Sequence, residues 1–351
     1  MRVLGEEQFG LLLDLRGDDV KKRQLINHPD DVVSEALEGM ELCFGDLIEY
    51  VPRYGLVRRR TPARDKVGVI SGGGSGHEPL HAGFVGTGML DVAVAGAVFA
   101  SPTALQVQEG TLAADSGRGV VQIVKNYTGD VLNFTIAGEL AGDSSVKTEI
   151  VLVDDDLATD TDDGGPGRRG TAAVVAVEKI VGALAEKGGS LEQVAEIGRR
   201  VARTSRTMSL ALEAGTHPGQ HEPAFQLASD EVELGVGIHG ERGTGRVPFA
   251  SADELTEQLV VPLLTDLGLS RGASVLAIVN GLGTTYPLEL TVAARAMHRL
   301  LTSRGISVAR TLVGSYVTSL DMHGFSITLT PADVDLLPLW DAPVRTPALT
   351  W

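Results

Sequence analysis

Three stretches of the sequence each bring a histidine or an aspartate to the end of an apolar run rich in Val and Ile. KVGVI leads through glycines to His77, VVQIVKN leads to Asp130, and ELGVGIHG contains His239. A neutral imidazole can attack a carbonyl carbon or move a proton, and a carboxylate can accept a proton. Because ligands of open α/β sheets bind at the carboxyl ends of the strands, the pattern favours one site built from all three side chains.

The glycine stretch SGGGSGHEP does not match the common nucleotide-binding loops. A P-loop ends in Gly-Lys-Ser/Thr, whereas this stretch ends in Gly76-His77. The glycines at 72, 74 and 76 also lack the spacing of a dinucleotide fingerprint, and Pro79 delays any helix. Two interpretations of the stretch remain. It is either a strand-end loop that brings backbone N–H groups and an imidazole to a small ligand, or, more simply, a tight turn with a structural histidine. Asp130 has its own simpler interpretation as a helix cap.

The elements around these residues predict an α/β fold with two α/β domains, whose largely parallel or mixed sheets are flanked by helices. The apolar runs lack alternation, which is typical of strands buried on both faces. The intervening segments have helical patterns, and we expect one helix over 101–115 with Ser101 as its N-cap. We place the first domain at 1–186, with the glycine loop and the acid/base residues, and the second at 187–335, with His239. The tail 336–351 is expected to pack back on the first domain.

Composition limits the possible partners and location. The 351 residues include 30 Lys and Arg against 46 Asp and Glu, a net charge of −16, which disfavours binding to nucleic acid or anionic membranes. Cys43 is the single cysteine, so no disulfide is expected. Apolar segments stay short of the roughly 18 residues that a membrane span needs, and the first residues lack the layout of a signal peptide. We therefore expect a cytoplasmic protein.

Taken together, long motifs in order along the chain resemble the dihydroxyacetone-binding subunit of the dihydroxyacetone kinase family. The resemblance runs from about Leu25 to the C-terminus. The stretches that carry it include GGGSGHEP (72–79), KNYTGDVLNF (125–134), GRRGTAAVVAVEKI (167–180), ELGVGIHGE (233–241) and VGSYVTSLDMHGFSITL (313–329).

The resemblance implies a role for each matching position. His239 would form a covalent hemiaminal with the carbonyl carbon of dihydroxyacetone. His77 and Asp130 would hydrogen-bond the bound triose and assist proton transfer. The remaining substrate-binding positions implied by the family are Gly74, Lys125, Phe99 and Ser101. Neither a metal-binding nor a cofactor-binding residue is expected in this chain, and Asp154–Asp156 are interpreted as a strand end followed by a polar loop.

The resemblance also implies an enzyme that works with other proteins. The chain would present a hydroxyl group of dihydroxyacetone for phosphorylation to dihydroxyacetone phosphate by a separate nucleotide-carrying subunit. ADP or ATP with Mg²⁺ would lie on that helical subunit, DhaL, which the phosphohistidine carrier DhaM of the phosphotransferase system recharges. A homodimer is expected. The alternatives are a kinase subunit for another short ketose, one with an ATP-using partner, or a non-catalytic ketose-sensing regulator.

Some segments depart from the family pattern. The segment 96–102 reads GAVFASP where the family commonly has a glutamate and a threonine, and the loop after His239-Gly240-Glu241 is two residues longer. The first 20 residues are an extension without an assigned role. The remaining histidines are expected to be structural or to lie on the surface; they are His28, His81, His217, His221, His298 and His323.

Overall fold

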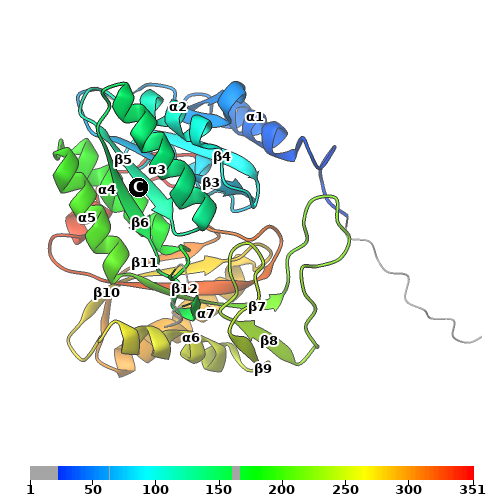
Figure 1. Cartoon of the computed structure of the whole chain (residues 1–351). Coiled ribbons are helices and arrows are strands. Elements are labelled where there is room, and N and C mark those ends of the chain that lie inside the picture. The colour runs from blue at the N-terminus through cyan, green and yellow to red at the C-terminus, as the bar shows by residue number, and fades with distance from the viewer. Residues whose placement is uncertain (1–22, 63, 160–166) are drawn as a thin grey trace, which may run out of the picture.

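The computed structural model describes residues 23–62, 64–159 and 167–351. The extension through residue 20 and the segment 160–166 therefore lie outside the described residues. Within the described residues the chain forms two six-stranded sheets with helices around them (Figure 1). The expected α/β fold is thereby confirmed.

The first sheet has the strand order β1-β2-β4-β3-β5-β6. β3 pairs in parallel with both β4 and β5, β5 pairs in parallel with β6, and β1 and β2 form an antiparallel edge. The bounds are β1 Ile48–Val51, β2 Leu56–Arg59, β3 Gly68–Ser75, β4 Val92–Val98, β5 Val120–Lys125 and β6 Thr148–Val153.

The second sheet has the order β11-β10-β12-β7-β8-β9. Only β10 and β11 pair in parallel among its described strands, so this sheet is mixed, which agrees with the expectation of largely parallel or mixed sheets. The bounds are β7 Arg206–Glu213, β8 Glu231–Leu234, β9 Gly245–Pro248, β10 Ser274–Gly281, β11 Ser307–Gly314 and β12 His323–Pro331.

The helices separate and cover these sheets. Their bounds are α1 Val32–Phe44, α2 Ala104–Ala114, α3 Thr128–Asp143, α4 Ala173–Glu186, α5 Leu191–Thr204, α6 Ala252–Asp266, α7 Pro287–Ser303 and α8 Leu337–Trp340, with short 3₁₀ turns η1 Pro52–Tyr54, η2 Ala82–Phe84 and η3 Leu157–Thr159. Among the residues that the structure describes, each helix is too short or too polar to cross a bilayer.

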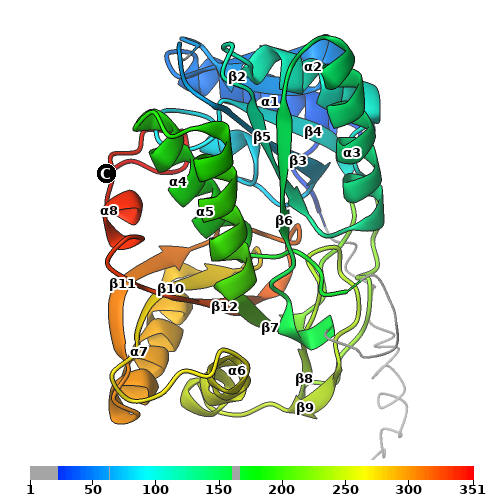
Figure 2. The ribbon, with the colours of Figure 1, turned by 60° about the vertical axis from the view of Figure 1, so that its left-hand side comes forward.

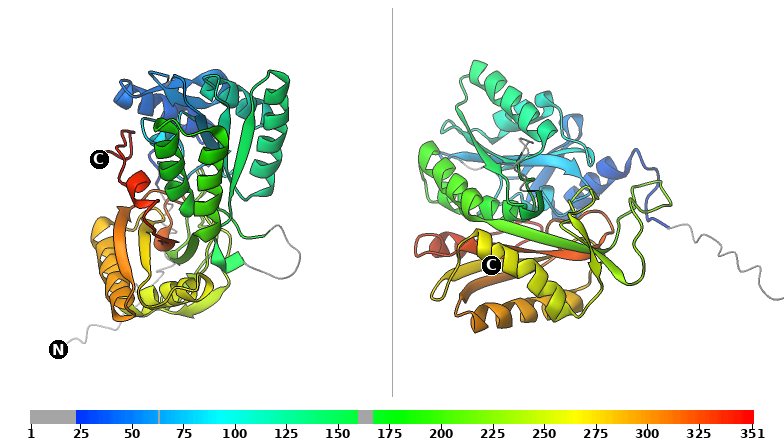
Figure 3. Two further views of the ribbon diagram at one scale, coloured as in Figure 1. Left: turned by 90° about the vertical axis from the view of Figure 1, so that its left-hand side faces the viewer. Right: turned by 60° about the horizontal axis from the view of Figure 1, so that its bottom comes forward.

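Three hydrophobic clusters define the layers. Phe134 of α3 packs with Ile70 of β3 on the outer face of the first sheet. On the inner face Ile180 of α4 shares a cluster with Ile278 of β10, so α4 and α5 lie between the two sheets (Figure 2). Leu259 of α6 belongs to the cluster on the outer face of the second sheet, which α6 and α7 cover (Figure 3). The resulting order is helix, sheet, helix, sheet, helix.

The middle layer is unusual because α4 is buried on almost every side. Even the adjacent Glu178 and Lys179 are fully buried. A helix that is buried all round must be apolar or must satisfy its polar groups internally. Lys179 does so by donating from Nζ to the carbonyl oxygen of Leu339, at 2.8 Å, in α8. The tail therefore lies against α4, while the domain boundary at 186/187 stays a prediction.

The helix expected to have its N-cap at Ser101 begins two residues later than predicted. Thr103, not Ser101, is the N-cap of α2, and it forms a capping box with Gln106. The Gln106 N–H donates to Thr103 Oγ1 and the Thr103 N–H donates to Gln106 Oε1. This reciprocal pair satisfies two N–H groups at once, which Ser101 as N-cap could not do because its N3 residue would be Ala104.

Candidate functional site

The predicted site residues of the first half lie where three neighbouring strands end. β3 lies between β4 and β5 in the sheet; the chain leaves β3 toward β4 on one side and leaves β5 toward β6 on the other. A crevice at such a reversal of strand order is the usual ligand site of open α/β sheets. His77 follows β3, Phe99 follows β4, and Lys125 is the last residue of β5.

The glycine stretch is a strand and only then a loop, which corrects the sequence prediction. Residues 72–75 belong to β3 and are fully buried. The stretch needs glycine because its neighbours approach the backbone closely. A Cβ added at Gly73 would lie 2.5 Å from Lys125 Nζ, and one added at Gly74 would lie 2.6 Å from the backbone nitrogen of Ala100. Gly74 therefore contacts the segment that carries Phe99, as backbone and not as side chain.

Two residues in left-handed backbone conformations hold the turn after β3. Phe99 has φ 55° and Leu320 has φ 56°, an unusual conformation for bulky side chains. The Phe99 N–H donates to Ser75 O at 2.9 Å, and the Leu320 N–H donates to Gly76 O at 2.8 Å. Such strain persists only where the surroundings enforce it, and it is often found at functional sites. The turn that ends in His77 is thus fixed from both halves of the molecule.

His77 is fully buried and has one defined tautomer. Its Nδ1 lies 2.8 Å from the carbonyl oxygen of Thr318, which can only accept, so Nδ1 carries the proton. Within the described part of the chain Nε2 has no hydrogen-bond partner. Burial, together with the nearby His239 and Lys125, holds the pKa of His77 well below its usual value. The ring is therefore neutral, with a free lone pair on Nε2.

Asp130 and Lys125 provide the charged groups of this side. Asp130 lies in the first turn of α3, but its side chain does not cap the helix, whose N-cap is Tyr127. It is 3% exposed, and Oδ1 lacks a hydrogen-bond partner among the residues described. Its Oδ2 lies 3.9 Å from Lys125 Nζ. The carboxylate is thus stabilised by one ammonium group and the helix N-terminus, with one oxygen still available.

His239 comes from the second half and reaches the same place, although it is not at a strand end. β8 ends at Leu234, so His239 lies in the loop that leads to β9. Its ring centroid is 4.9 Å from that of His77, 5.2 Å from that of Phe99 and 4.4 Å from that of Tyr127. Three rings of the first half therefore surround the imidazole, and His77 and His239 meet edge to face.

Glu241 fixes the tautomer of His239. Its Oε1 lies 3.1 Å from His239 Nδ1, and its Oε2 accepts the backbone N–H of His239 at 3.0 Å. A carboxylate only accepts, so Nδ1 carries the proton and Nε2 keeps its lone pair. Burial alone would raise the pKa of Glu241, but the hydrogen bond and charge of His239 and the charge of Arg169 lower it to about 2. The group is an anion throughout the physiological range.

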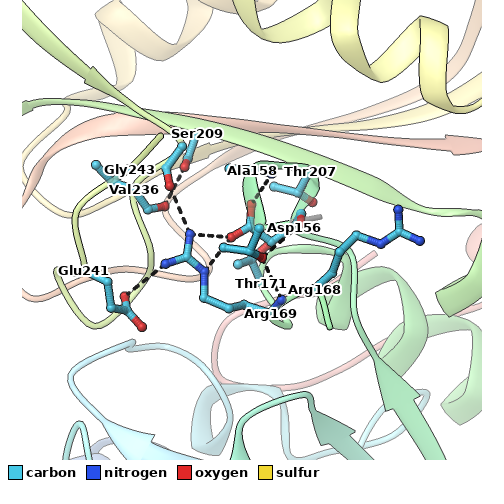
Figure 4. A network of polar contacts seen from close by, with 12 residues as sticks. Asp156, Ala158, Arg168, Arg169, Thr171, Thr207, Ser209, Val236, Glu241 and Gly243 are labelled. Carbon is cyan, nitrogen blue, oxygen red and sulfur yellow. Dashed lines mark hydrogen bonds and ion pairs between the residues drawn. The ribbon is translucent and has the colours of Figure 1, made fainter. Parts of the chain in front are cut away.

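Arg169 connects this loop to the segment after β6. It lies between Asp156 and Glu241, and its guanidinium also donates to the carbonyl oxygen of Gly235 at 3.0 Å (Figure 4). Its Nε donates to Asp156 Oδ2 at 2.7 Å, while Nη1 lies 3.8 Å from Glu241 Oε2. Burial raises the pKa of Asp156 to about 6 against the opposing charge of Arg169. One arginine thus supports both the backbone and the carboxylate that orient His239.

The structure therefore brings together the sequence-predicted His77, Phe99, Lys125, Asp130 and His239, with Gly74 in the adjoining strand. Ser101 lies farther out, against the first turn of α3, because a Cβ added at Gly129 would lie 2.7 Å from its Oγ.

Sequence reasoning did not select several residues around these groups. Glu241, Tyr127 and Arg169 all lie inside the quoted motifs. Glu241 and Tyr127 are two positions from His239 and Lys125, which was the available signal for them, whereas Arg169 has no selected residue near it in the sequence. Thr318 acts through its backbone carbonyl, so its residue type carries no signal. His217, expected to be structural or on the surface, has its ring 4.9 Å from that of Phe99.

Comparison with known proteins gives a consistent result. A model of the Dak1 domain matches residues 38–348. The chain is 44% identical over 321 residues to the dihydroxyacetone-binding subunit DhaK of a PTS-dependent dihydroxyacetone kinase of Listeria innocua, covering 90% of this chain and 98% of that protein. It is 42% identical over 353 residues to the corresponding subunit of the PEP-dependent kinase of Escherichia coli K12, covering 94% and 99%. Among solved structures, a dihydroxyacetone kinase operon co-activator, DhaQ, aligns with a TM-score of 0.85 at 32% identity, covering 92% of this chain and 98% of that one.

Proposed function

The chain belongs to the Dak1 family and is a dihydroxyacetone-binding subunit of a PTS-dependent dihydroxyacetone kinase, and we propose that it holds its substrate as a covalent hemiaminal on His239. The observation that carries the proposal is the set of contacts of this imidazole. Glu241 holds Nδ1, which leaves the Nε2 lone pair for a carbonyl carbon, and His77 lies edge to face with the ring.

The covalent step conserves atoms. The Nε2 lone pair of His239 forms the bond to the keto carbon, and the π electrons of the C=O bond move to its oxygen. Overall the ring loses the proton on Nδ1, toward Glu241 at 3.1 Å, and the former carbonyl oxygen gains one proton. The anionic Glu241 stabilises positive charge on the ring while the bond forms.

A covalent bond also explains how a small polar ligand is selected. Dihydroxyacetone has roughly six heavy atoms, which caps non-covalent affinity at about 9 kcal/mol even at the best efficiency per atom. Glycerol offers nearly the same hydroxyl groups but no carbonyl group. A bond from His239 therefore discriminates ketose from polyol without additional contacts.

Phosphoryl transfer then requires a base, and the buried groups of the first half supply it. We assign Asp130 to accept the proton of the attacking primary hydroxyl, as an aspartate does in other kinases. His77 is neutral with its proton on Nδ1, so its Nε2 accepts a hydrogen bond from the substrate. Lys125, Gly74, Phe99 and Ser101 are proposed to line the pocket.

The phosphoryl donor is proposed to come from partner proteins. A helical subunit would hold ADP and Mg²⁺, and a phosphohistidine carrier would recharge it; the chain itself would be a homodimer. Mixing the purified chain with such a subunit, carrier and phosphoenolpyruvate should convert dihydroxyacetone to dihydroxyacetone phosphate. If only ATP supported turnover, the assignment to the phosphotransferase system would be wrong.

A second candidate is a ketose-sensing regulator, because a co-activator has the same fold over nearly the whole chain. The presence of both His77 and Asp130 favours the enzyme, since a sensor needs no base for phosphoryl transfer. Calorimetric titration with dihydroxyacetone and glycerol, beside the transfer assay, distinguishes the two. Selective ketose binding without transfer in the complete reconstituted system would support the sensor.

A further inference from the structure

A row of buried polar side chains leads from Asp130 into the middle layer of the molecule. Lys125 Nζ lies 3.9 Å from Asp130 Oδ2 and 2.8 Å from His81 Nε2. His81 Nδ1 lies 2.6 Å from Glu178 Oε1, on α4. These four side chains, the relay residues, are each 5% exposed or less. His81 and Glu178 have no role in the mechanism described so far, and sequence reasoning treated His81 as structural.

With Lys125 as an ammonium group and Glu178 as a carboxylate, the direction of each hydrogen bond in the row is defined. An ammonium group only donates, so Lys125 donates to His81 Nε2. The ring then carries its proton on Nδ1 and donates it to the carboxylate of Glu178. Each imidazole nitrogen is engaged, in contrast to His77, whose Nε2 is free. His81 can therefore pass a proton through its ring but cannot also bind the substrate.

A second arrangement of the same protons satisfies the same hydrogen bonds. If Lys125 transfers a proton to His81 Nε2 while Nδ1 releases its proton to Glu178, the result is a neutral amine, a neutral ring and a carboxylic acid. Burial favours this form, because it lowers the pKa of Lys125 and raises the pKa of Glu178 to about 8. Burial and the charge of Lys125 also hold the pKa of His81 well below its usual value, so the ring is not a resting cation.

We propose that His81 and Glu178 form a proton relay that regenerates Asp130 during phosphoryl transfer. The proposal rests on the assignment of Asp130 as the base. As the triose oxygen bonds to the phosphorus of the donor phosphoanhydride and the leaving oxygen departs with its electron pair, the hydroxyl proton moves to Asp130. Lys125, made neutral by passing one proton through His81 to Glu178, takes that proton from Asp130. The relay residues thus gain one proton in total, which returns to water after the product leaves.

The surroundings of Glu178 predict a pH dependence. The titratable groups near it are His81 from the turn after β3 and Lys125 from β5, while the hydroxyl of Ser71 on β3 also faces it. Below a pH of about 8 Glu178 is protonated while Lys125 still carries its charge, so both groups already hold a proton and the relay cannot accept another. Turnover should therefore rise with pH through this range.

The decisive variant is His81→Gln. A glutamine amide can accept from Lys125 and donate to Glu178, so it preserves the hydrogen bonds, but it cannot pass a proton. In the reconstituted kinase kcat should fall about tenfold or more, and the rise of kcat with pH should disappear. The affinity for dihydroxyacetone, measured by calorimetry, should stay within about twofold.

The matched control is His298→Gln, on α7, whose ring contacts Thr311 far from the site. It should retain wild-type turnover and pH profile. Should His81→Gln fail to fold, Glu178→Gln tests the same step, because an amide cannot take up the proton. Wild-type kcat with an unchanged pH profile in either folded variant overturns the relay. His239→Ala tests the covalent proposal separately, because it should abolish binding of dihydroxyacetone, whereas His81→Gln should keep binding and lose turnover. Failure of one proposal can therefore be told from failure of the other.

Discussion

The two sides of the site are built in different ways. On the side of the first sheet, His77, Lys125 and Asp130 are 3% exposed or less, and their positions follow from strand ends and one helical turn. On the other side His239 lies in a loop, with 20% of its side chain exposed, and its orientation depends on Glu241. His239 is therefore less constrained by burial than the groups of the first sheet, and its geometry depends on the carboxylate of Glu241.

The electrostatics of the two sides differ as well. Burial lowers the pKa of His77, and it lowers the pKa of Lys125 against the opposing charges of Asp130 and Glu178. Glu241 is also substantially buried, yet His239 and Arg169 reverse the effect of burial and lower its pKa. On the first side burial thus favours the neutral forms of His77 and Lys125. On the second side Glu241 stays an anion and stabilises positive charge on the ring of His239.

The largest expected effect is a loss of phosphoryl transfer when the proposed base of the first side is removed. Asp130→Asn removes the proposed base but leaves His239 and Glu241 in place. We expect kcat to fall by about 10² to 10⁴, the usual contribution of a positioned base, with nearly unchanged affinity for dihydroxyacetone. Asp143→Asn, at the exposed end of the same helix, is the control. If Asp130→Asn transferred phosphate at the wild-type rate, the assignment of Asp130 as the base would be wrong.

A somewhat smaller effect should come from the anion of the second side. Glu241→Gln keeps the size of the side chain but no longer stabilises positive charge on His239. Affinity for dihydroxyacetone should drop about 10- to 100-fold, the range seen when the partner of a functional histidine is removed. Glu231→Gln, on β8, is the matched control and should bind normally. Equal affinities of the two variants would mean that Glu241 does not activate the ring.

The rigidity of the first side can be tested through its backbone. Gly74→Ala puts a methyl group against the backbone of Phe99 and Ala100, and we expect it to lower the free energy of unfolding by about 1–3 kcal/mol. Gly142→Ala, at an open position in α3, should instead be neutral or slightly stabilising. Urea denaturation measures both. If Gly74→Ala left the free energy of unfolding unchanged, β3 would be less tightly packed against the segment of Phe99 and Ala100 than the structure shows.

The smallest effect concerns stability in acid. The pKa of Glu241 in the folded protein is about 2, below its ordinary value of 4.5. Its stabilising contribution is therefore complete above about pH 4.5 and is lost as the pH falls toward 2. Urea midpoints between pH 5 and 2 should fall less steeply for Glu241→Gln than for the wild type. Identical slopes would contradict the lowered pKa.

The sequence predicted the architecture well where local pattern and topology agree. Runs such as VVQIVK at 120–125 are buried on both faces and became central strands, and the fold class followed. The prediction was wrong where tertiary contacts override local preference. The glycines 72–74 stay extended because neighbouring strands pair with them, and His239 lies beyond β8 because that strand stops at Leu234.

The site was predicted unevenly for a similar reason. Residues at strand ends could be selected because topology brings them to one edge. Two of the relay residues, His81 and Glu178, are 97 positions apart and meet only through the packing of α4 under the first sheet. Thr318 contributes a backbone atom, which every residue type possesses. Such partners cannot be selected from residue type and spacing.

The covalent bond to His239 can be observed directly by NMR. Dihydroxyacetone labelled with ¹³C at its keto carbon is added to protein whose histidines carry ¹⁵N in the ring. The account predicts that the keto signal moves from the carbonyl region to that of a tetrahedral carbon and acquires a one-bond coupling to ¹⁵N, which His239→Ala abolishes. A bound ligand that retains its carbonyl signal, or a coupling that persists in His239→Ala, would contradict it.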